Sequence, residues 1–246
     1  MMNHTTKGIV LRTVKYGETS VIVSIFTELF GLQSYIVNGV RSSSKKAGTK
    51  ANLFQPGALL DLVVYHNEQK NLQRIKEYQW SVLYEHIFFD VFKGSVATFM
   101  VELLQKCLRE PEPNPDMFDF VEDVLLHLDK APSSVVANFP LFFALHLPAF
   151  FGFRIPDEYS VTRNILDLEE GIFVAQHPAH SFYLDGQLSE TTATLLRVMH
   201  PSELEDIGLP VAVRRILLQH YEKYYMLHVP EFGHLRTLPV LQEVLG

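Results

Sequence analysis

The first eighty residues consist of short apolar runs separated by turn residues, a pattern typical of β-strands. β-Branched and aromatic residues dominate these runs, as in Val21-Ile22-Val23 and Tyr35-Ile36-Val37, and they favour a pleated, half-buried surface. The pattern predicts five strands, at residues 5–16, 19–27, 32–41, 58–66 and 71–79. Five consecutive strands in about 75 residues predict a small closed barrel of the oligonucleotide- and oligosaccharide-binding (OB) type, which binds ligands on one face and on its loops.

After Trp80 the spacing of apolar residues changes from two to about 3.6, which predicts helices. The expected helices lie at residues 81–91, 93–109, 116–128, 133–151, 189–199 and 210–229, with a final turn at 239–245. Residues 152–186 are rich in Gly, Pro, Asn and Asp, so we expect a small irregular insertion there, in which the apolar run 171–174 pairs as a minor hairpin. The predicted fold class is α+β and multi-domain, with an OB-fold barrel over residues 1–80 and an α-helical domain over residues 81–246.

Positive charge is concentrated in the predicted barrel, although the formal net charge of the chain is −7. Residues 1–80 hold ten Lys and Arg against five Asp and Glu, a balance of +5, whereas residues 81–246 hold 11 against 23, a balance of −12. A bias of opposite sign in two parts of a chain suggests that the basic part contacts nucleic acid.

The densest positive charge lies in a loop of small residues between the third and fourth predicted strands. No acidic residue occurs between Glu28 and Asp61. Four cations stand in the middle of this gap: Arg41, Lys45, Lys46 and Lys50. The neighbouring Ser, Gly and Thr residues offer hydroxyl and amide donors to phosphate oxygens. The loop is therefore a candidate phosphate-binding element, with a solvated surface loop as the alternative.

Further basic residues lie inside the predicted strands, close to aromatic residues. They are Lys7, Arg12, Lys15, Arg74 and Lys76, of which Lys15 directly precedes Tyr16. Single-stranded nucleic acid uses both kinds of side chain, because its backbone binds cations and its bases stack on flat rings at roughly 1 to 3 kcal/mol each. The rings of Tyr35, Phe54, Tyr65 and Tyr78 serve either this stacking or, alternatively, the closure of the barrel ends as core residues.

No catalytic motif stands out in the sequence. His-Glu-x-x-His, Gly-x-Ser-x-Gly and Gly-x-Gly-x-x-Gly are all absent, so we expect no enzyme and no cofactor. The single cysteine, Cys107, excludes an intramolecular disulfide and a multi-cysteine zinc site, and its apolar helical stripe predicts a core position. His177 and His180 lack a third convincing ligand nearby in sequence, so we expect no metal; a metal-dependent hydrolase that uses them is the remaining enzymatic alternative.

No apolar stretch reaches the roughly 20 residues that a bilayer span needs. The longest, residues 139–153, is interrupted by Pro140, His146 and Pro148. The amino-terminal residues also lack the pattern of a secretory signal. We therefore expect no membrane contact and a cytoplasmic protein.

Five sequence blocks in the first eighty residues follow one another in a recognisable order. They are KGIVLRT at 7–13, YGETS at 16–20, FTELFG at 26–31, NGVRSSSK at 38–45 and LFQPGALLDL at 53–62. With this order and spacing, the region resembles the N-terminal domain of the RecO family of bacterial recombination and repair proteins. Over residues 81–246 the resemblance rests on helical content, on length and on FFGF at 150–153 leading to Pro156.

The resemblance implies a non-catalytic role. It implies binding of single- and double-stranded DNA, annealing of complementary strands, and assistance to RecA in loading onto strands covered by the single-strand binding protein. It further implies RecR as a partner, contact of the helical domain with the C-terminal tail of the single-strand binding protein, and association with the bacterial nucleoid. Many members carry four zinc-ligand cysteines in the insertion that corresponds to residues 152–186; this chain has none there, and we expect hydrogen bonding and packing to hold the insertion instead.

Combining the residues with the resemblance gives a mechanism of electrostatic capture followed by alignment. The loop cations are expected to neutralise the phosphates of one strand, while Lys7, Arg12, Lys15, Arg74 and Lys76 extend the positive track. Neutralising both strands reduces the repulsion that opposes annealing. The alternative is an OB-fold scaffold that binds proteins without binding DNA.

Overall fold

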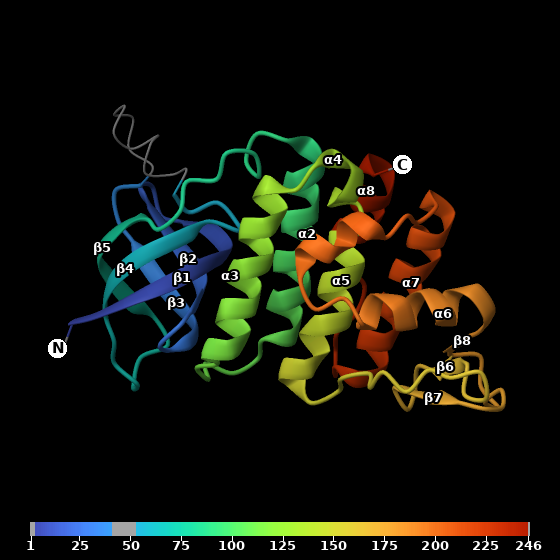
Figure 1. The fold of residues 1–246 in the computed structure, drawn as a ribbon. Coiled ribbons are helices and arrows are strands. Elements are labelled where there is room, and N and C mark those ends of the chain that lie inside the picture. Colours follow the sequence, from blue (N-terminus) through green and yellow to red (C-terminus); the bar gives the residue numbers. More distant parts are fainter. Residues whose placement is uncertain (1–2, 41–52, 246) are drawn as a thin grey trace. The chain divides into compact units, whose positions relative to one another are not determined.

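The computed structural model describes residues 3–40 and 53–245 of the chain (Figure 1). Its contacts divide the chain into two compact units. The first comprises Met1–Tyr84 and Leu108–Leu125, and the second comprises Glu85–Cys107 and Leu126–Gly246. Within the described residues, none of the helices combines the length and apolarity that a bilayer crossing requires.

The first unit is built on a closed barrel of five strands (Figure 1). The strands are β1 (Asn3–Tyr16), β2 (Ser20–Thr27), β3 (Gly31–Val37), β4 (Leu59–Tyr65) and β5 (Gln73–Trp80). They close in the order β1-β2-β3-β5-β4, with antiparallel neighbours except for the parallel β3–β5 pair. The five-stranded barrel predicted from the sequence is confirmed.

The barrel interior is filled by alternate side chains of every strand, as the period of two requires. Val23, Ile25 and Val64 are fully buried. Gly8 stands among them because no side chain fits: a Cβ there would lie 2.6 Å from Ile25 Cγ2 and 2.9 Å from a methyl of Leu62. The interior is thus packed without room for a ligand at this level.

Helix α3 (Pro115–Lys130) belongs to the same unit as far as Leu125, and this part packs on the outside of the barrel. Its Phe118 is fully buried with its ring 5.7 Å from that of Phe26. Ile9 pairs with Phe26 across β1 and β2, so this outward row is apolar where the helix covers it. The N-terminus of α3 is capped by Asn114, whose Oδ1 accepts the backbone N–H of Met117 at 3.0 Å.

The second unit consists of helices and one small sheet. Its helices are α2 (Val91–Cys107), α4 (Ser133–Val136), α5 (Phe139–His146), α6 (Gly186–Leu196), α7 (Val211–His228) and α8 (Thr237–Val244), with 3-10 turns η1 (Leu147–Phe151) and η2 (Pro201–Asp206). The sheet has the order β7-β6-β8, from β6 (Ile165–Asp167), β7 (Ile172–Val174) and β8 (Tyr183–Leu184). The predicted minor hairpin therefore exists as β6 and β7, and β8 adds a third strand.

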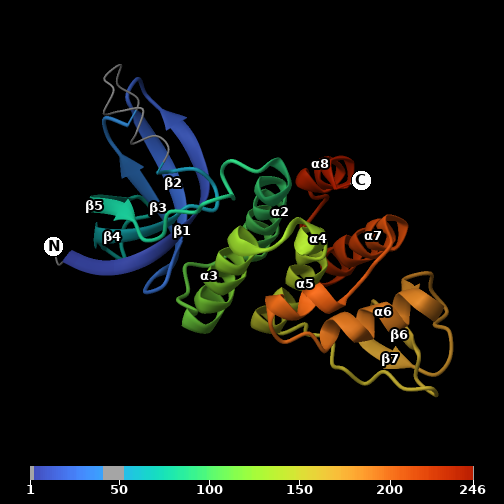
Figure 2. The ribbon, with the colours of Figure 1, turned by 45° about the horizontal axis from the view of Figure 1, so that its top comes forward.

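Helix α5 is the centre of this unit. All its residues from Phe139 to Leu145 are buried, because it contacts α2, α6 and α7 around its circumference (Figure 2). A helix that is apolar on every side is stable only when neighbours cover it in this way. Cys107, at the end of α2, is also buried, which agrees with the predicted core position.

The helix predicted at residues 81–91 is wrong, since these residues form turns. The carboxylate of Asp129, which is 5% exposed, accepts the backbone N–H groups of Glu85, His86 and Ile87, each at 2.8 Å. These donors are the ones that a helix would use internally, so the carboxylate competes with helix formation. Asp90 then caps α2 by accepting the N–H of Phe92, and the helix begins only at Val91.

The single helix predicted at residues 133–151 is also wrong, because it is broken into α4, α5 and η1. Pro140 and Pro148 each stand in the first turn of a new segment, where a missing N–H costs nothing. Asn138 lies at the first break and is 2% exposed, and its side-chain amide donates to the Ile207 carbonyl oxygen at 2.8 Å. The break therefore ties α4 and α5 to the η2 region.

Asp129 provides a test of this fold. Burial raises its pKa, but the three backbone hydrogen bonds outweigh burial and leave the pKa below its ordinary value of 3.8. A carboxyl with a depressed folded pKa contributes stability above its unfolded pKa and loses it as the pH falls through the folded value. We expect Asp129→Asn to lose about 2 kcal/mol at pH near 7, because an amide cannot accept all three bonds and carries no charge.

Urea unfolding and hydrogen exchange of the 85–87 amides measure this loss, with Asp119→Asn, exposed on α3, as the control. The difference between wild type and Asp129→Asn should shrink below pH 3.8, where the wild-type carboxyl becomes protonated. Equal stability of the two proteins at neutral pH would contradict this role for Asp129.

Candidate nucleic-acid interface

A bulge in β1 decides which way Arg12 points. Val10 pairs with Ile25 and faces the barrel interior, and in a regular strand Arg12, two residues on, would share that face. The register shifts between these positions, and Arg12 pairs with Ser24 instead. The extra residue, Leu11, absorbs the shift, so Arg12 is turned outward and exposed.

The outward side chains beyond the bulge form rows across the sheet. Val14 pairs with Ile22, Ile22 with Ile36, and Ile36 with Arg74. Because partners in register point to the same face, Arg74 points to the outside of the barrel, as Arg12 does. In the closed order β1-β2-β3-β5-β4, only β4 stands between β1 and β5 on the shorter side, which makes two strand spacings, roughly 10 Å. The outside of the barrel thus carries two exposed guanidinium groups on different parts of its circumference, with the apolar row of Val14 and Ile22 next to Arg12.

The end of β1 adds an aromatic ring to this surface, and a further cation on the other face of the strand, because Lys15 pairs with the buried Val21. Lys15 and Tyr16 are exposed, and Tyr16 pairs with Ser20 in the register. The Tyr16 ring is 51% exposed, which leaves it available for stacking. Ser20 Oγ donates to Asn38 Oδ1 at 2.9 Å, so the chain leaves β3 beside this end of β1.

The four loop cations predicted to bind phosphate, Arg41, Lys45, Lys46 and Lys50, lie outside the described residues. The residues that precede them, Asn38 to Val40, follow β3 at the end of the barrel where Tyr16 stands.

Lys7 does not join the others on this surface. Its Nζ donates to Glu122 Oε1 at 2.7 Å, and this hydrogen bond, together with the nearby carboxylates of Glu122, Glu28 and Asp61, raises the pKa of its ammonium against the opposing effect of burial. The residue precedes the bulge and lies on the face that α3 covers. Its charge is compensated by carboxylates, and it ties the helix to the barrel.

Lys76 stands at a second bulge. Val64 pairs with Ile75 and Val63 with Glu77, which leaves Lys76 as the extra residue of β5. Its Nζ lies 3.1 Å from Glu77 Oε1, and both side chains are exposed. An exposed ion pair between neighbours contributes little to stability, so this lysine can exchange its partner. Among the described residues, no carboxylate forms an ion pair with Arg12, Lys15 or Arg74.

Two of the four rings considered for base stacking are core residues. Tyr35 is 0% exposed and Phe54 is 2% exposed, so neither presents a face to a ligand, and the stacking hypothesis is wrong for both. Phe54 packs against the ring of Tyr78 at 4.9 Å between centroids. Tyr65 is half-buried and pairs with Arg74. Tyr16 is the exposed ring that the register brings to the basic surface.

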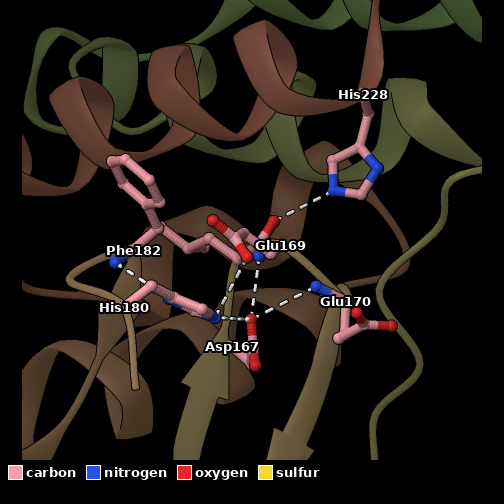
Figure 3. Close-up of polar contacts among 7 residues, drawn as sticks. Asp167, Glu169, Glu170, His180, Phe182 and His228 are labelled. Atoms are coloured by element: carbon pink, nitrogen blue, oxygen red, sulfur yellow. Dashed lines mark hydrogen bonds and ion pairs between the residues drawn. The ribbon is translucent and has the colours of Figure 1, made fainter. Parts of the chain in front are cut away.

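The insertion between residues 152 and 186 is held by a network around Asp167 (Figure 3). The Asp167 side chain is 8% exposed, and its Oδ1 accepts the backbone N–H groups of Glu169 at 2.8 Å and Glu170 at 3.2 Å. The imidazole Nε2 of His180 lies 3.4 Å from Asp167 Oδ1 and 3.4 Å from Glu169 Oε2. Since His180 Nδ1 accepts the N–H of Phe182, the ring proton of the neutral form sits on Nε2, facing both carboxylates.

The network is anchored to α7. His228 Nε2 lies 2.9 Å from the Leu168 carbonyl oxygen (Figure 3). The Phe153 ring stacks on the His228 ring, with 5.4 Å between their centroids. The turn between β6 and β7 needs Gly171, whose φ is +67° and whose Cβ would lie 2.7 Å from the Tyr224 hydroxyl. Side-chain hydrogen bonds and close packing therefore fix this insertion.

These residues do not fit a four-thiolate zinc site. Cys107, the one cysteine of the chain, lies on α2 and not in the insertion. Over residues 3–40 and 53–245, no three His, Cys, Asp or Glu side chains gather in a way that could hold a metal ion. His177 and His180 are engaged separately, since His177 Nε2 lies 3.0 Å from Asp185 Oδ2. We assign both histidines to local structure.

The fold and this surface define a class of protein in which an OB-type barrel with an outward basic face is joined to a helical unit. The family model described as "Recombination protein O N terminal" matches residues 1–84, and the one described as "Recombination protein O C terminal" matches residues 89–238. The chain belongs to the RecO family of DNA repair proteins.

Relatives match over nearly their full length. The chain is 34% identical over 241 residues to the DNA repair protein RecO of Bacteroides fragilis, covering 97% of this chain and 98% of the relative. It is 31% identical over 243 residues to that of Flavobacterium johnsoniae, covering 98% of each. The protein of Porphyromonas gingivalis is 30% identical over 239 residues, covering 96% of each.

The carboxylate of Asp167 is expected to hold the insertion in place of a metal. Asp167→Ala leaves two backbone donors without their acceptor and the His180 ring with Glu169 as its remaining carboxylate partner, so we expect a loss of about 1 to 3 kcal/mol in local stability. Hydrogen exchange over residues 165–184 measures this loss. The matched control is Glu170→Ala, which removes an exposed carboxylate of the same turn; equal protection in the two variants would overturn the assignment.

Proposed function

We propose that this protein binds single- and double-stranded DNA through the barrel surface that carries Arg12, Lys15, Tyr16 and Arg74. The observation that supports this most directly is the bulge in β1, which exposes Arg12 on the outside of the barrel, where Arg74 is also exposed. Exposed cations without carboxylate partners suit phosphate, and the chain as a whole is acidic, so the positive potential is local.

The strand would lie along the cations with a base on the Tyr16 ring. Its phosphates would contact the guanidinium group of Arg12 and, as the strand follows the barrel round, that of Arg74, and the apolar row of Val14 and Ile22 next to Arg12 would face sugars and bases. Lys76 would exchange Glu77 for phosphate at the edge of this track. The cations at 41, 45, 46 and 50 would add contacts from the loop. Lys7, which is compensated by Glu122, takes no part in this proposal.

Binding of this kind accounts for strand annealing. Two complementary strands repel each other through their phosphates, and cations that neutralise both lower the cost of bringing them together. Phosphate contacts carry no sequence information, so any complementary pair would be served. We further propose that the protein assists RecA loading on strands coated by the single-strand binding protein and that RecR is its partner.

For the acidic tail of the single-strand binding protein, we propose a recess of about 130 Å³ in the helical unit. Its lining includes Lys130, His127 and one carboxylate, Glu205, together with the apolar Val135 and Phe139. The basic groups would bind a carboxylate of the tail, and the apolar residues would contact an apolar side chain next to it. All residues that line this recess belong to the second unit.

A protein-binding scaffold is the second candidate, because the apolar Val14, two residues after Arg12 on β1, is 43% exposed. A scaffold would bind partners through the apolar strip and would ignore polyanions. Competition by unlabelled heparin or mixed-sequence DNA separates the two candidates, since it displaces a strand from the basic surface only if phosphate contacts hold it.

The double variant Arg12→Ala/Arg74→Ala tests the proposed surface. We expect its affinity for single strands to fall roughly tenfold or more, by a similar factor for every sequence, because each lost contact is a charge-assisted hydrogen bond to phosphate. Strand annealing with and without single-strand binding protein should slow in parallel. The control is Arg154→Ala/Arg236→Ala, which removes the same charge from exposed positions of the helical unit. An equal loss in the control, or a sequence-selective loss, would refute the proposed surface.

A further inference from the structure

A pocket of about 660 Å³ opens within the first unit, beside the basic surface. Its walls come from the β2–β3 turn, the start of β3, the β4–β5 loop and residues 109–113, which all belong to that unit. The volume falls within the range of small-molecule sites, roughly 300 to 1,000 Å³. The phosphate contacts proposed for the barrel do not involve this pocket.

A stacked pair of rings lines one wall of this pocket. The rings of Phe30 and His66 lie nearly parallel, with centroids 4.0 Å apart and an angle of 12° between their planes. His4 meets the Phe30 ring edge-on at 5.3 Å. Burial lowers the pKa of His66 against the raising effect of Glu68, so the imidazole is neutral at pH 7. The pair is an uncharged flat platform, which is the surface on which nucleobases stack.

The walls are preorganised rather than loose. Gln73 is 3% exposed, and its side-chain amide fixes the β4–β5 loop by donating to the carbonyl oxygens of Asn67 at 2.8 Å and Lys70 at 2.6 Å. Its Oε1 accepts the Asn67 N–H at 3.0 Å. On the opposite wall, Gly31 has φ +60°, and a Cβ there would lie 2.1 Å from the Glu112 carbonyl oxygen. The proline-containing segment after Leu108 therefore lies directly against the turn that carries Phe30.

The charge of the pocket wall and its connection to the basic surface indicate what the pocket binds. Lys70 and Arg109 stand in the pocket wall against one carboxylate, that of Glu68, so the wall carries a net positive charge. Ser34, also in the wall, pairs with Ser24, which pairs with Arg12. The pocket thus continues the outward row of the basic surface, and a polyanion lying on that row has a path into it.

We propose that this pocket receives an unstacked base of the single strand bound on the barrel surface, with its ring on the Phe30–His66 pair and its flanking phosphates next to Lys70 and Arg109. The inference rests on the proposed function, because the strand must first lie on the basic surface. In this proposal the Phe30–His66 pair binds a base of the DNA, whereas the cations bind its phosphates.

The first test compares a dT oligonucleotide with an abasic strand of the same length, which has the same phosphates and no bases. Phe30→Leu keeps the apolar volume and removes the flat ring. We expect it to weaken binding of the dT strand roughly 5- to 100-fold, as loss of one stacked base does, and to leave binding of the abasic strand unchanged. Phe89→Leu, at an exposed ring of the helical unit, is the matched control and should change neither.

The second test uses the unaltered protein and so does not depend on the folding of a variant. Strands with 5-iodo-deoxyuridine are photo-crosslinked to the full chain, and the attachment sites are mapped by mass spectrometry. We expect attachment at Phe30 or His66. Attachment at Tyr16 without any in the pocket, or equal loss of both strands with Phe30→Leu, would overturn this inference and keep the proposed function. Failure of both strands to bind would overturn the two together.

Discussion

The bulge at Leu11 is the constraint on which the properties of the barrel depend. It divides β1 into one part whose outward side chains pack against α3 and another part whose outward side chains are exposed. Before it, the outward side chains meet α3, and their one cation, Lys7, is paired with Glu122 at 2.7 Å. After it, Arg12 and Tyr16 point outward and are exposed. A single extra residue thus separates a face used for packing from a face free to bind.

Buried carboxylates play a comparable part in the helical unit. Asp129 gathers three backbone N–H groups before α2, and Asp167 gathers two at the turn of the insertion. In each case one charged acceptor satisfies donors that regular secondary structure would otherwise use, which is the strongest kind of hydrogen bond available to a backbone. The insertion keeps a defined shape by this means, although the chain has no cysteine there.

The sequence was sufficient for the barrel and for most helices, because alternation of apolar residues with a period of two or 3.6 reports directly on burial. It was not sufficient where a distant residue intervenes. The helix expected at 81–91 is replaced by turns because of Asp129, some forty positions away, and the pairing of Lys7 depends on Glu122 in a helix that the pattern alone does not dock. Bulges are equally invisible, since Leu11 and Lys76 look like ordinary strand residues. Whether an aromatic ring is buried depends on its position in the barrel, which the sequence pattern does not give: Tyr35 is in the core, whereas Tyr16 is on the surface.

The central claim is that phosphate contacts made by exposed cations of the barrel hold single-stranded DNA. Its most direct measurement is the affinity for a dT oligonucleotide as a function of salt, from about 50 to about 200 mM. If roughly four phosphates are neutralised, a plot of the logarithm of affinity against the logarithm of salt concentration should have a slope of about −3. A slope near zero would contradict the claim.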